Sequence, residues 1–293
     1  MSVQSTKSVL LPLSIAIPSS FIDVYSNNSQ KTQQIGRIAR AAAIFQVDEI
    51  IIYLDRQNQK QRKNNKLISL VLNYMETPQY LRKHLFGRIP ELHYAGLLPP
   101  LRTPHHPLEK VSNALKANEI REGYAFIDKR QLVVDIGIET PIPLLKANSL
   151  NPPTRLTVKI QLNQKGHFVA YPCRPPRTKK YWGYQVVELQ SSLSEFLVKT
   201  SDYKYIVATT RKGAPIKTKV DLLHQKWQKA VRLLLLFGTH KEGLSEILAR
   251  EGYSLSSLTD YSINILPHQG VATIRTEEAV FIALTGFRLL EQK

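Results

Sequence analysis

The chain has 293 residues, of which 43% are hydrophobic, and a formal net charge of +17; this apolar content supports a packed core and excludes wholesale disorder. The positive charge favours a polyanionic partner. Nucleic acid is the usual candidate and an anionic membrane surface is the rival. The alternative to both is a protein whose surface is basic without binding a polyanion. No apolar run reaches the roughly 18–20 residues of a membrane span, and the single Cys173 leaves no internal disulfide or cysteine zinc site, so we expect a cytoplasmic protein.

The first elements of the chain predict a β-α-β unit. Residues 8–17 are rich in Leu, Ile and Val and end at a proline, which is typical of a buried strand. Residues 32–45 place apolar side chains at helical spacing, with Arg37 and Arg40 together on another face. Residues 47–54 form a second apolar run, whose continuity is typical of a parallel sheet covered on both sides.

The next segment is first polar and then rich in proline. Residues 56–66 are dense in Gln, Asn, Lys and Arg, and we expect a solvated loop that leads into a helix near residue 65. A patch that contacts phosphates is the alternative reading of this loop. Thr77 is expected as an N-cap with Pro78 at the first helical position. From Gly87 onward, repeated prolines break any helix, which indicates a linker.

A stretch of alternating and turn-forming residues then predicts a small β-barrel. Its strand-like pieces lie at residues 119–127, 131–136, 142–145, 155–162 and 168–171. Five short strands fit an OB-fold, the usual five-stranded barrel that binds oligonucleotides, but the pattern alone does not separate it from an SH3-like barrel. His105 and His106, on the approach to this barrel, have no cysteine or carboxylate set nearby, so no metal is expected.

The chain leaves the predicted barrel through a segment in which cations alternate with aromatic residues and prolines. Guanidinium and indole groups both stack on nucleic-acid bases. We therefore expect four cations to contact RNA, namely Arg174, Arg177, Lys179 and Lys180. Trp182 is expected in the core, and a rigid linker is the alternative reading of the whole segment.

The alternation of strands and helices resumes in the last third of the chain. Strands are expected at residues 186–189, 203–209, 231–237 and 261–266. Helices are expected at residues 192–199, 222–230 and 241–250, and in a last helix capped by Thr276. Because β-α alternation flanks an insert made of strands alone, we predict one α/β domain from residues 1–88 and 172–293, interrupted by a barrel at residues 89–171.

Three glycine-bearing turns follow strands of this last third, at residues 209–213, 238–243 and 266–273. Ligands of open α/β sheets bind where such loops leave the carboxyl ends of strands, and glycine permits positive φ and close backbone approach. The residues expected to contact a cofactor are Thr209, Thr210, Arg211, Gly213, Phe237, Gly238, Gly243, Asn264, Leu266, Pro267, Gln269, Gly270 and Thr273. The absence of Gly-x-Gly-x-x-Gly and of a P-loop motif disfavours a Rossmann-type dinucleotide site and a P-loop NTPase.

The run Asn264-Ile-Leu-Pro-His-Gln-Gly-Val-Ala-Thr-Ile-Arg-Thr-Glu-Glu-Ala279 resembles the cofactor-binding end of the SPOUT class of RNA methyltransferases. The runs Ala95-Gly-Leu-Leu-Pro-Pro-Leu101 and Pro104-His-His-Pro107 are similar to landmarks of the subfamily with an inserted OB-fold. The resemblance covers nearly the whole chain. It implies an α/β fold with a mainly parallel sheet and a deep C-terminal trefoil knot, S-adenosyl-L-methionine as cofactor, and a homodimer. The pattern of elements alone does not predict a knot.

The resemblance also implies a function, methylation of RNA, and relatives of the subfamily suggest uridine N3 in ribosomal RNA as the target. In several SPOUT enzymes an arginine of the N-terminal half places the RNA. Arg37 is therefore our catalytic candidate, with Arg40 behind it. The alternative is that both are solvated arginines on the face of a helix. Glu277 is available as a general base, although a glutamate in the first turn of a helix is equally explained by helix capping. Gln269 and Arg275 are candidates for polar contacts in the site.

A non-catalytic RNA-binding factor in ribosome assembly is the alternative function. The open glycine turns argue against this alternative, because a protein without catalytic activity does not need loops that leave room for an adenine. A membrane-surface protein is disfavoured because the chain has no basic amphipathic helix with an apolar face to insert.

Overall fold

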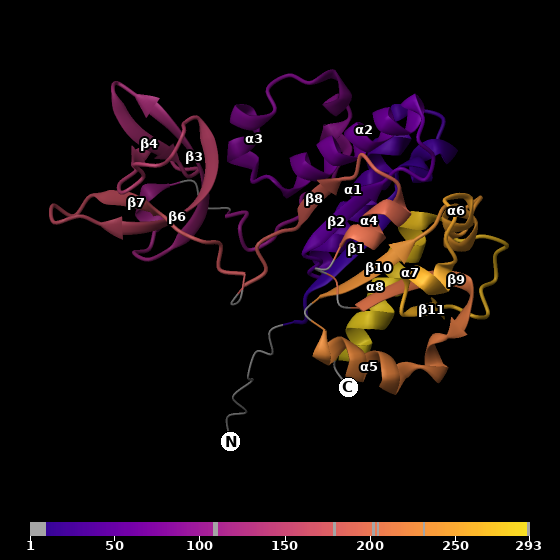
Figure 1. Cartoon of the computed structure of the whole chain (residues 1–293). Coiled ribbons are helices and arrows are strands. Elements are labelled where there is room, and N and C mark those ends of the chain that lie inside the picture. The colour runs from indigo at the N-terminus through magenta and orange to yellow at the C-terminus, as the bar shows by residue number, and fades with distance from the viewer. Residues whose placement is uncertain are drawn as a thin grey trace. The chain divides into compact units, whose positions relative to one another are not determined.

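The computed structural model describes residues 10–107, 111–177, 180–200, 203, 205–230 and 232–291 (Figure 1). The chain forms two compact units. The first consists of Met1–Asn73, Glu91–Pro99 and Gly183–Lys293, and the second of Tyr74–Pro90 and Pro100–Trp182. These bounds differ from those of the expected domains at residues 1–88 with 172–293 and at 89–171, and that division stays a prediction.

The first unit is built on a parallel sheet with the strand order β11-β9-β10-β1-β2-β8. Its strands are β1 (Leu13–Pro18), β2 (Glu49–Tyr53), β8 (Gln185–Glu188), β9 (Tyr205–Pro215), β10 (Leu233–Phe237) and β11 (Tyr261–Asn264). The central pair β1 and β10 is fully buried, as their continuous apolar sequences predict. Because all strands run the same way, the loops that follow β9, β10 and β11 begin at one edge of the sheet.

Helices cover this sheet. The helices of the first unit are α1 (Asn28–Ile44), α4 (Leu193–Lys199), α5 (Val220–Lys229), α6 (Leu244–Arg250), α7 (Leu255–Leu258) and α8 (Thr276–Glu291), together with most of α2 (Gln59–Glu76). Leu193 of α4 and Ile247 of α6 belong to a buried cluster with Leu234 and Leu236 of β10. The intervening residues of β10 point to the opposite face, since side chains alternate along a strand.

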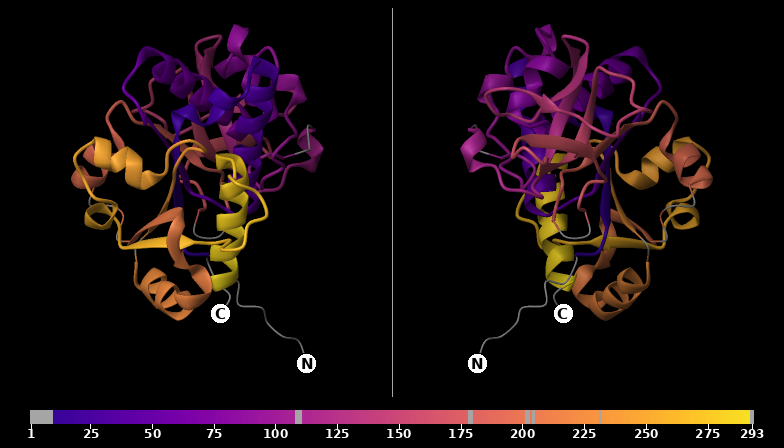
Figure 2. Two further views of the ribbon diagram at one scale, coloured as in Figure 1. Left: turned by 90° about the vertical axis from the view of Figure 1, so that its right-hand side faces the viewer. Right: turned by 90° about the vertical axis from the view of Figure 1, so that its left-hand side faces the viewer.

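Helix α8 packs against two other helices of the first unit. Phe281 meets Phe45, directly after α1, with ring centroids 6.2 Å apart, and Phe287 meets Trp227 of α5 at 5.9 Å. Both views of Figure 2 show α8, in yellow, beside α5, in orange. These aromatic contacts hold α8 in place, and the start of this helix forms part of the candidate site.

The expectation of a solvated loop at residues 56–66 is wrong for most of that range. Helix α2 begins at Gln59, and several of its polar side chains are buried amides rather than solvated groups. Gln61 Nε2 donates to Asp55 Oδ2 at 2.9 Å, and Asn65 Nδ2 donates to a backbone carbonyl at 3.0 Å. Polar composition was misleading here because each buried amide has a specific hydrogen-bond partner.

The second unit contains an antiparallel sheet in the order β5-β4-β3-β6-β7. Its strands are β3 (Ile120–Asp128), β4 (Gln131–Asp135), β5 (Ile142–Pro143), β6 (Thr154–Leu162) and β7 (Phe168–Pro172). A bridge between Leu144 and Ala170 nearly closes the sheet into a barrel. Every predicted strand of this segment is present, and the interior is filled by small and branched side chains such as Ala125, Val134 and Val158.

Short helical segments precede this barrel-like sheet: α3 (Gln79–Leu85), η2 (Pro90–Leu92), η3 (Ala95–Leu97) and η4 (Ser112–Ala114). The expected cap at Thr77 is wrong, because Pro78 occupies the N-cap position of α3 and makes no side-chain cap hydrogen bond. The Thr77 hydroxyl instead accepts a hydrogen bond from Arg155 Nη1 at 3.3 Å.

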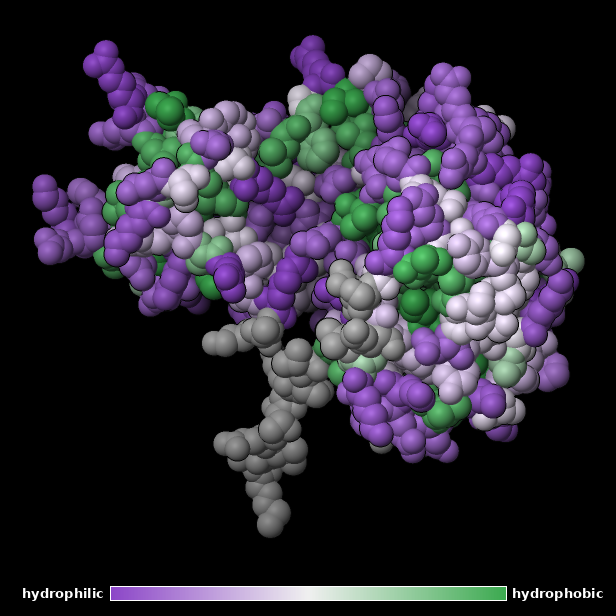
Figure 3. All heavy atoms as spheres, viewed as in Figure 1, coloured by the Kyte–Doolittle hydropathy of each residue, from purple (hydrophilic) through white to green (hydrophobic). Residues whose placement is uncertain are grey.

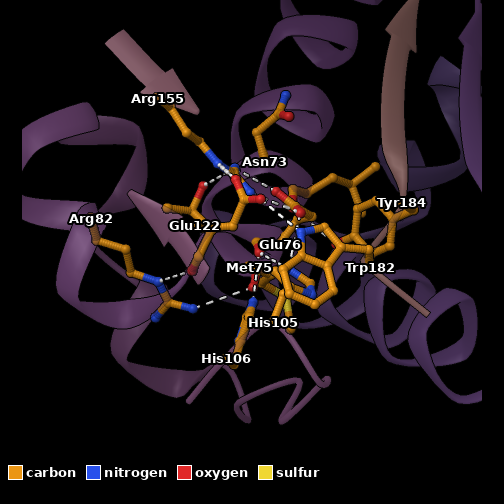
Figure 4. Close-up of polar contacts among 12 residues, drawn as sticks. Asn73, Met75, Glu76, Arg82, His105, His106, Glu122, Arg155, Trp182 and Tyr184 are labelled. Carbon is orange, nitrogen blue, oxygen red and sulfur yellow. Dashed lines mark hydrogen bonds and ion pairs between the residues drawn. The ribbon is translucent and has the colours of Figure 1, made fainter. Parts of the chain in front are cut away.

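A buried polar cluster within the second unit joins the last residue of α2 to β3 and β6 (Figure 4). Glu76 accepts from both Arg155 terminal nitrogens, at 2.7 and 3.1 Å, and from His105 Nε2 at 3.0 Å. Burial alone would raise the pKa of Glu76, but the His105 hydrogen bond and the Arg155 charge outweigh it and lower the pKa to about 2. Glu122 accepts from Arg155 Nε at 2.8 Å and from Trp182 Nε1 at 2.7 Å.

The surface visible in Figure 3 is largely hydrophilic. On the face shown in Figure 3, hydrophilic residues cover most of the molecule and apolar residues form separate patches. In the part of the chain that the structure describes, no helix combines the length and the apolar character needed to cross a membrane.

Candidate functional site

A cavity of about 330 Å³ lies at the carboxyl edge of the parallel sheet in the first unit. Its walls are the end of β9, the loop 238–243 after β10, the loop 265–275 after β11, and the first turns of α8. The volume falls in the range of small-molecule sites, and the lining mixes apolar and polar residues. The position agrees with the rule that ligands of open parallel sheets bind beyond the carboxyl ends of the strands.

Most residues expected to contact a cofactor line this cavity. They are Thr209, Thr210, Arg211, Phe237, Gly238, Gly243, Asn264, Leu266, Gln269 and Thr273. Gly213, Pro267 and Gly270 do not line it. Convergence of three segments from distant parts of the sequence is therefore a property of the fold, while the cofactor contacts themselves stay a prediction.

The first wall is a strand and not the loop that the sequence predicts. Strand β9 continues to Pro215 and pairs with β11 across a register shift after Ser262. A Cβ atom at Gly213 would lie 2.6 Å from the backbone nitrogen and carbonyl carbon of Ile263. Gly213 thus permits the backbones of β9 and β11 to approach closely, and its expected contact with a cofactor stays a prediction.

The second wall is a turn organised by Thr239. Its hydroxyl accepts the backbone N–H groups of Lys241 and Glu242, at 3.1 and 2.8 Å. A Cβ atom at Gly238 would lie 3.1 Å from the Glu242 carbonyl oxygen, so the narrow turn favours glycine there. Among the described glycines, neither Gly238 nor Gly243 adopts positive φ. The positive φ that the sequence permits at these two glycines is therefore not used, and only the space left by the missing side chain is.

The third wall is held together by its own polar side chains. Gln269 Nε2 donates to the Val271 carbonyl at 2.8 Å, and Asn264 Nδ2 donates to the Arg211 carbonyl at 2.8 Å. Arg211 Nη1 in turn donates to the Ala272 carbonyl at 2.9 Å. The hydrogen bonds of Asn264 and Arg211 join the first wall to the third.

The last helix begins against the second wall. Thr276, expected as its cap, is instead the first residue of α8, and its hydroxyl donates to the Gly238 carbonyl at 3.1 Å. This bond connects the loop after β10 with the helix that closes the cavity.

The cavity lining carries more positive than negative charge. Arg211, Lys212 and Lys241 line it, and the one carboxylate among the described lining residues is Glu246. Lys212 Nζ lies 2.8 Å from Glu246 Oε1, and this hydrogen bond lowers the pKa of Glu246. The surplus cations suit a ligand with a carboxylate or phosphate. No group of three His, Cys, Asp or Glu residues in the described parts of the chain could hold a metal ion.

A buried tyrosine–glutamate pair lies at the start of α8. The Tyr25 hydroxyl donates to Glu277 Oε1, and Arg275 Nη1 donates to the same hydroxyl at 3.3 Å. Burial and the Glu277 hydrogen bond raise the pKa of Tyr25 to about 12. Glu277 is 1% exposed and does not line the cavity, so the structure does not favour it as a general base.

The described candidates for catalysis and RNA binding lie outside the cavity lining. Arg37 is exposed on α1 and Arg40 is half-buried, and neither lines the cavity. In the second unit the exposed cations include Arg174, Arg177 and Lys180. Lys179 lies outside the described residues, and the expected RNA contacts and catalytic roles stay predictions. Trp182 is 5% exposed, which confirms its expected place in a core.

Sequence reasoning missed a further set of lining residues: Lys212, Thr239, His240, Lys241, Leu244, Glu246, Ile263, Ile265, Ala272, Ile274, Thr276, Ala279, Ile282 and Ala283. The sequence of α8 did contain a signal for its lining residues, because Thr276, Ala279 and Ala283 recur at helical spacing and so lie on one face of the helix. His240 and Lys241 lie inside a turn that was already predicted to border the site.

Comparison with known proteins shows the family to which the chain belongs. A family model described as "Putative RNA methyltransferase" matches residues 12–287. A 28S rRNA (uridine-N(3))-methyltransferase of Drosophila melanogaster is 32% identical over 94% of this chain, which spans 61% of the fly protein. The Homo sapiens protein of the same name is 32% identical over 94% of this chain and 77% of its own length.

An uncharacterized protein of Haloarcula marismortui is 29% identical over 95% of this chain and 99% of its own length. The cavity at the carboxyl edge of the sheet lies within the region that the family model covers. The chain belongs to this family of RNA methyltransferases.

Proposed function

We propose that the protein transfers a methyl group from S-adenosyl-L-methionine to a uridine ring nitrogen, N3, of ribosomal RNA. The observation that carries the proposal is the cavity walled by β9, the loop after β10 and the loop after β11. The relatives named as uridine-N3 methyltransferases of 28S rRNA support the choice of base and of RNA. The net charge of +17 suits a polynucleotide substrate.

The residues of the cavity fit this cofactor, which supplies a methyl group activated by a sulfonium. Phe237, Leu244 and Ile282 give apolar surface for an adenosyl group. Arg211 and Lys241 are suited to the carboxylate of the methionine part. The narrow turn at Gly238, which has no side chain, permits close approach of the backbone to a ligand at that position.

We further propose that the parallel sheet is the knotted sheet of the SPOUT class, that the barrel-like sheet is an OB-fold, and that two chains form a homodimer. The placement of β9, β10, β11 and α8 around one cavity supports the first point. The five-stranded, nearly closed sheet of the second unit supports the second. Exposed Arg37 remains our candidate for placing the RNA.

Mapping of ribosomal RNA tests this function. In cells lacking the protein, we expect one N3-methyluridine to disappear, seen as the loss of a primer-extension stop and of the methylated nucleoside by mass spectrometry. Restoring the wild-type chain should restore both signals. Unchanged N3-methyluridine would favour the alternative, a non-catalytic RNA-binding factor in ribosome assembly.

A further inference from the structure

His240 occupies a position that a reactive group of this site would need. It lies in the loop directly after β10, lines the cavity and is half-exposed. Among the described residues, none is hydrogen-bonded to its ring nitrogens, whereas His84, His105 and His106 each bond a protein oxygen. An imidazole without a protein partner is free to exchange a proton with a bound molecule.

The other polar groups of the cavity are less suited to accept a proton. The lysines and arginines that line it are suited to bind an anion rather than to accept a proton. Glu246 is paired with Lys212, whose Nζ lies 2.8 Å from Glu246 Oε1. Glu277 is buried, hydrogen-bonded to Tyr25 and outside the lining.

The surroundings of His240 favour the neutral form of its ring. Burial lowers its pKa first, and the cations Lys241 of the same loop and Arg275 before α8 lower it further. Glu277 of α8 and Asp23 of the η1 segment (Ser19–Val24) act in the opposite direction but do not reverse the shift. A neutral imidazole has a ring nitrogen that can accept a proton, and Lys241, which also lines the cavity, can stabilise an anion formed there.

We propose that His240 is the general base of the methyl transfer, an inference that rests on the proposed function. N3 of uridine carries a proton, and its direct methylation would leave a cationic ring. The proton passes to an unprotonated ring nitrogen of His240, and the electron pair of the N–H bond stays on N3. That pair forms the new bond to the methyl carbon, the pair of the broken carbon–sulfur bond goes to sulfur, and His240 later releases its proton to water.

His240→Gln tests the proposal, with His268→Gln as the matched control. His268 is exposed in the loop after β11 and does not line the cavity. With a methylatable ribosomal RNA fragment, we expect His240→Gln to lower kcat/KM by about 10²–10⁴-fold. The wild type should show an acidic limb in its pH profile that this variant lacks, and His268→Gln should behave as the wild type.

Two measurements separate a chemical role from a structural one. Calorimetry should give His240→Gln an affinity for S-adenosylhomocysteine within about 2-fold of the wild type, a change far below one factor of ten. In NMR spectra of the wild type, the His240 ring, identified by its absence from the variant, should titrate below the ordinary value of 6.5.

Three results would overturn the proposal. One is a His240→Gln variant with the wild-type rate and acidic limb, and another is a rate loss that parallels a loss of S-adenosylhomocysteine binding. The third is a wild-type protein that transfers no methyl group to RNA, which alone would also overturn the proposed function.

Discussion

Gly213 lies where the backbones of β9 and β11 approach each other closely beside the candidate site. We expect Gly213→Ala to destabilise the protein by about 1–3 kcal/mol, because the added Cβ would lie 2.6 Å from backbone atoms of Ile263 that have no rotamer to change. Gly270→Ala is the control, since nothing lies within 4 Å of a Cβ at that position.

Urea unfolding followed by circular dichroism measures both changes. A lower midpoint for Gly213→Ala with little change for Gly270→Ala would agree with the packing role. Equal midpoints for the two variants would contradict this role, because they would show that β11 can shift away from the added Cβ without loss of stability. The sequence predicted Gly213 as a special position, but a glycine required by a neighbouring strand and one required by a ligand look identical in a single sequence.

At the scale of elements, the buried polar cluster of the second unit gives stability that depends on pH. Burial and the neighbouring His105 lower the pKa of His106 to about 4 from its ordinary value of 6.5. The folded state then favours the neutral ring, so stability is full above pH 6.5 and falls as the pH drops toward 4. The contribution of Glu76 has the same sign but a lower window, because its pKa of about 2 lies below an ordinary 4.5.

We therefore expect His106→Gln to remove part of this acid sensitivity. Between pH 6.5 and 4 the wild type should lose up to about 3 kcal/mol more stability than the variant. The amide of Gln can still donate to the Glu76 carbonyl, which His106 Nε2 approaches at 2.6 Å. His167→Gln, at an exposed position of the second unit, is the control. Parallel pH curves for His106→Gln and the wild type, from urea midpoints, would contradict the assignment.

Elements with strong periodicity could be predicted from the sequence, and elements shaped by distant partners could not. The strands of the second unit were found because their side chains alternate between core and solvent. The extension of β9 beyond Thr209 was missed, because polar residues 209–213 fall in a register shift, and pairing with β11 resumes only at Ala214. Helix α2 was shortened in the prediction because its buried amides resemble a solvated surface in composition.

At the scale of the whole molecule, the site is assembled from segments that the sequence keeps far apart. Thr209, Gly238 and Gln269 line one cavity although β10 and α6 lie between them in the chain. The strand-end rule predicted which turns would meet, and the resemblance to SPOUT enzymes predicted the ligand. Neither could predict His240, because a side chain's freedom from hydrogen bonds depends on the folded surroundings of the loop.

The central claim is that this cavity binds the adenosyl cofactor, and calorimetric titration with S-adenosylhomocysteine tests it most directly. Ala272→Trp should weaken binding at least about tenfold, because Ala272 is an exposed lining residue and the indole would fill the cavity. Val271→Trp, at the exposed neighbouring position outside the lining, should leave the affinity unchanged. Saturable binding by the wild type, lost only in Ala272→Trp, is the result we predict; no heat at about 1 mM ligand, or equal binding by both variants, would contradict the account.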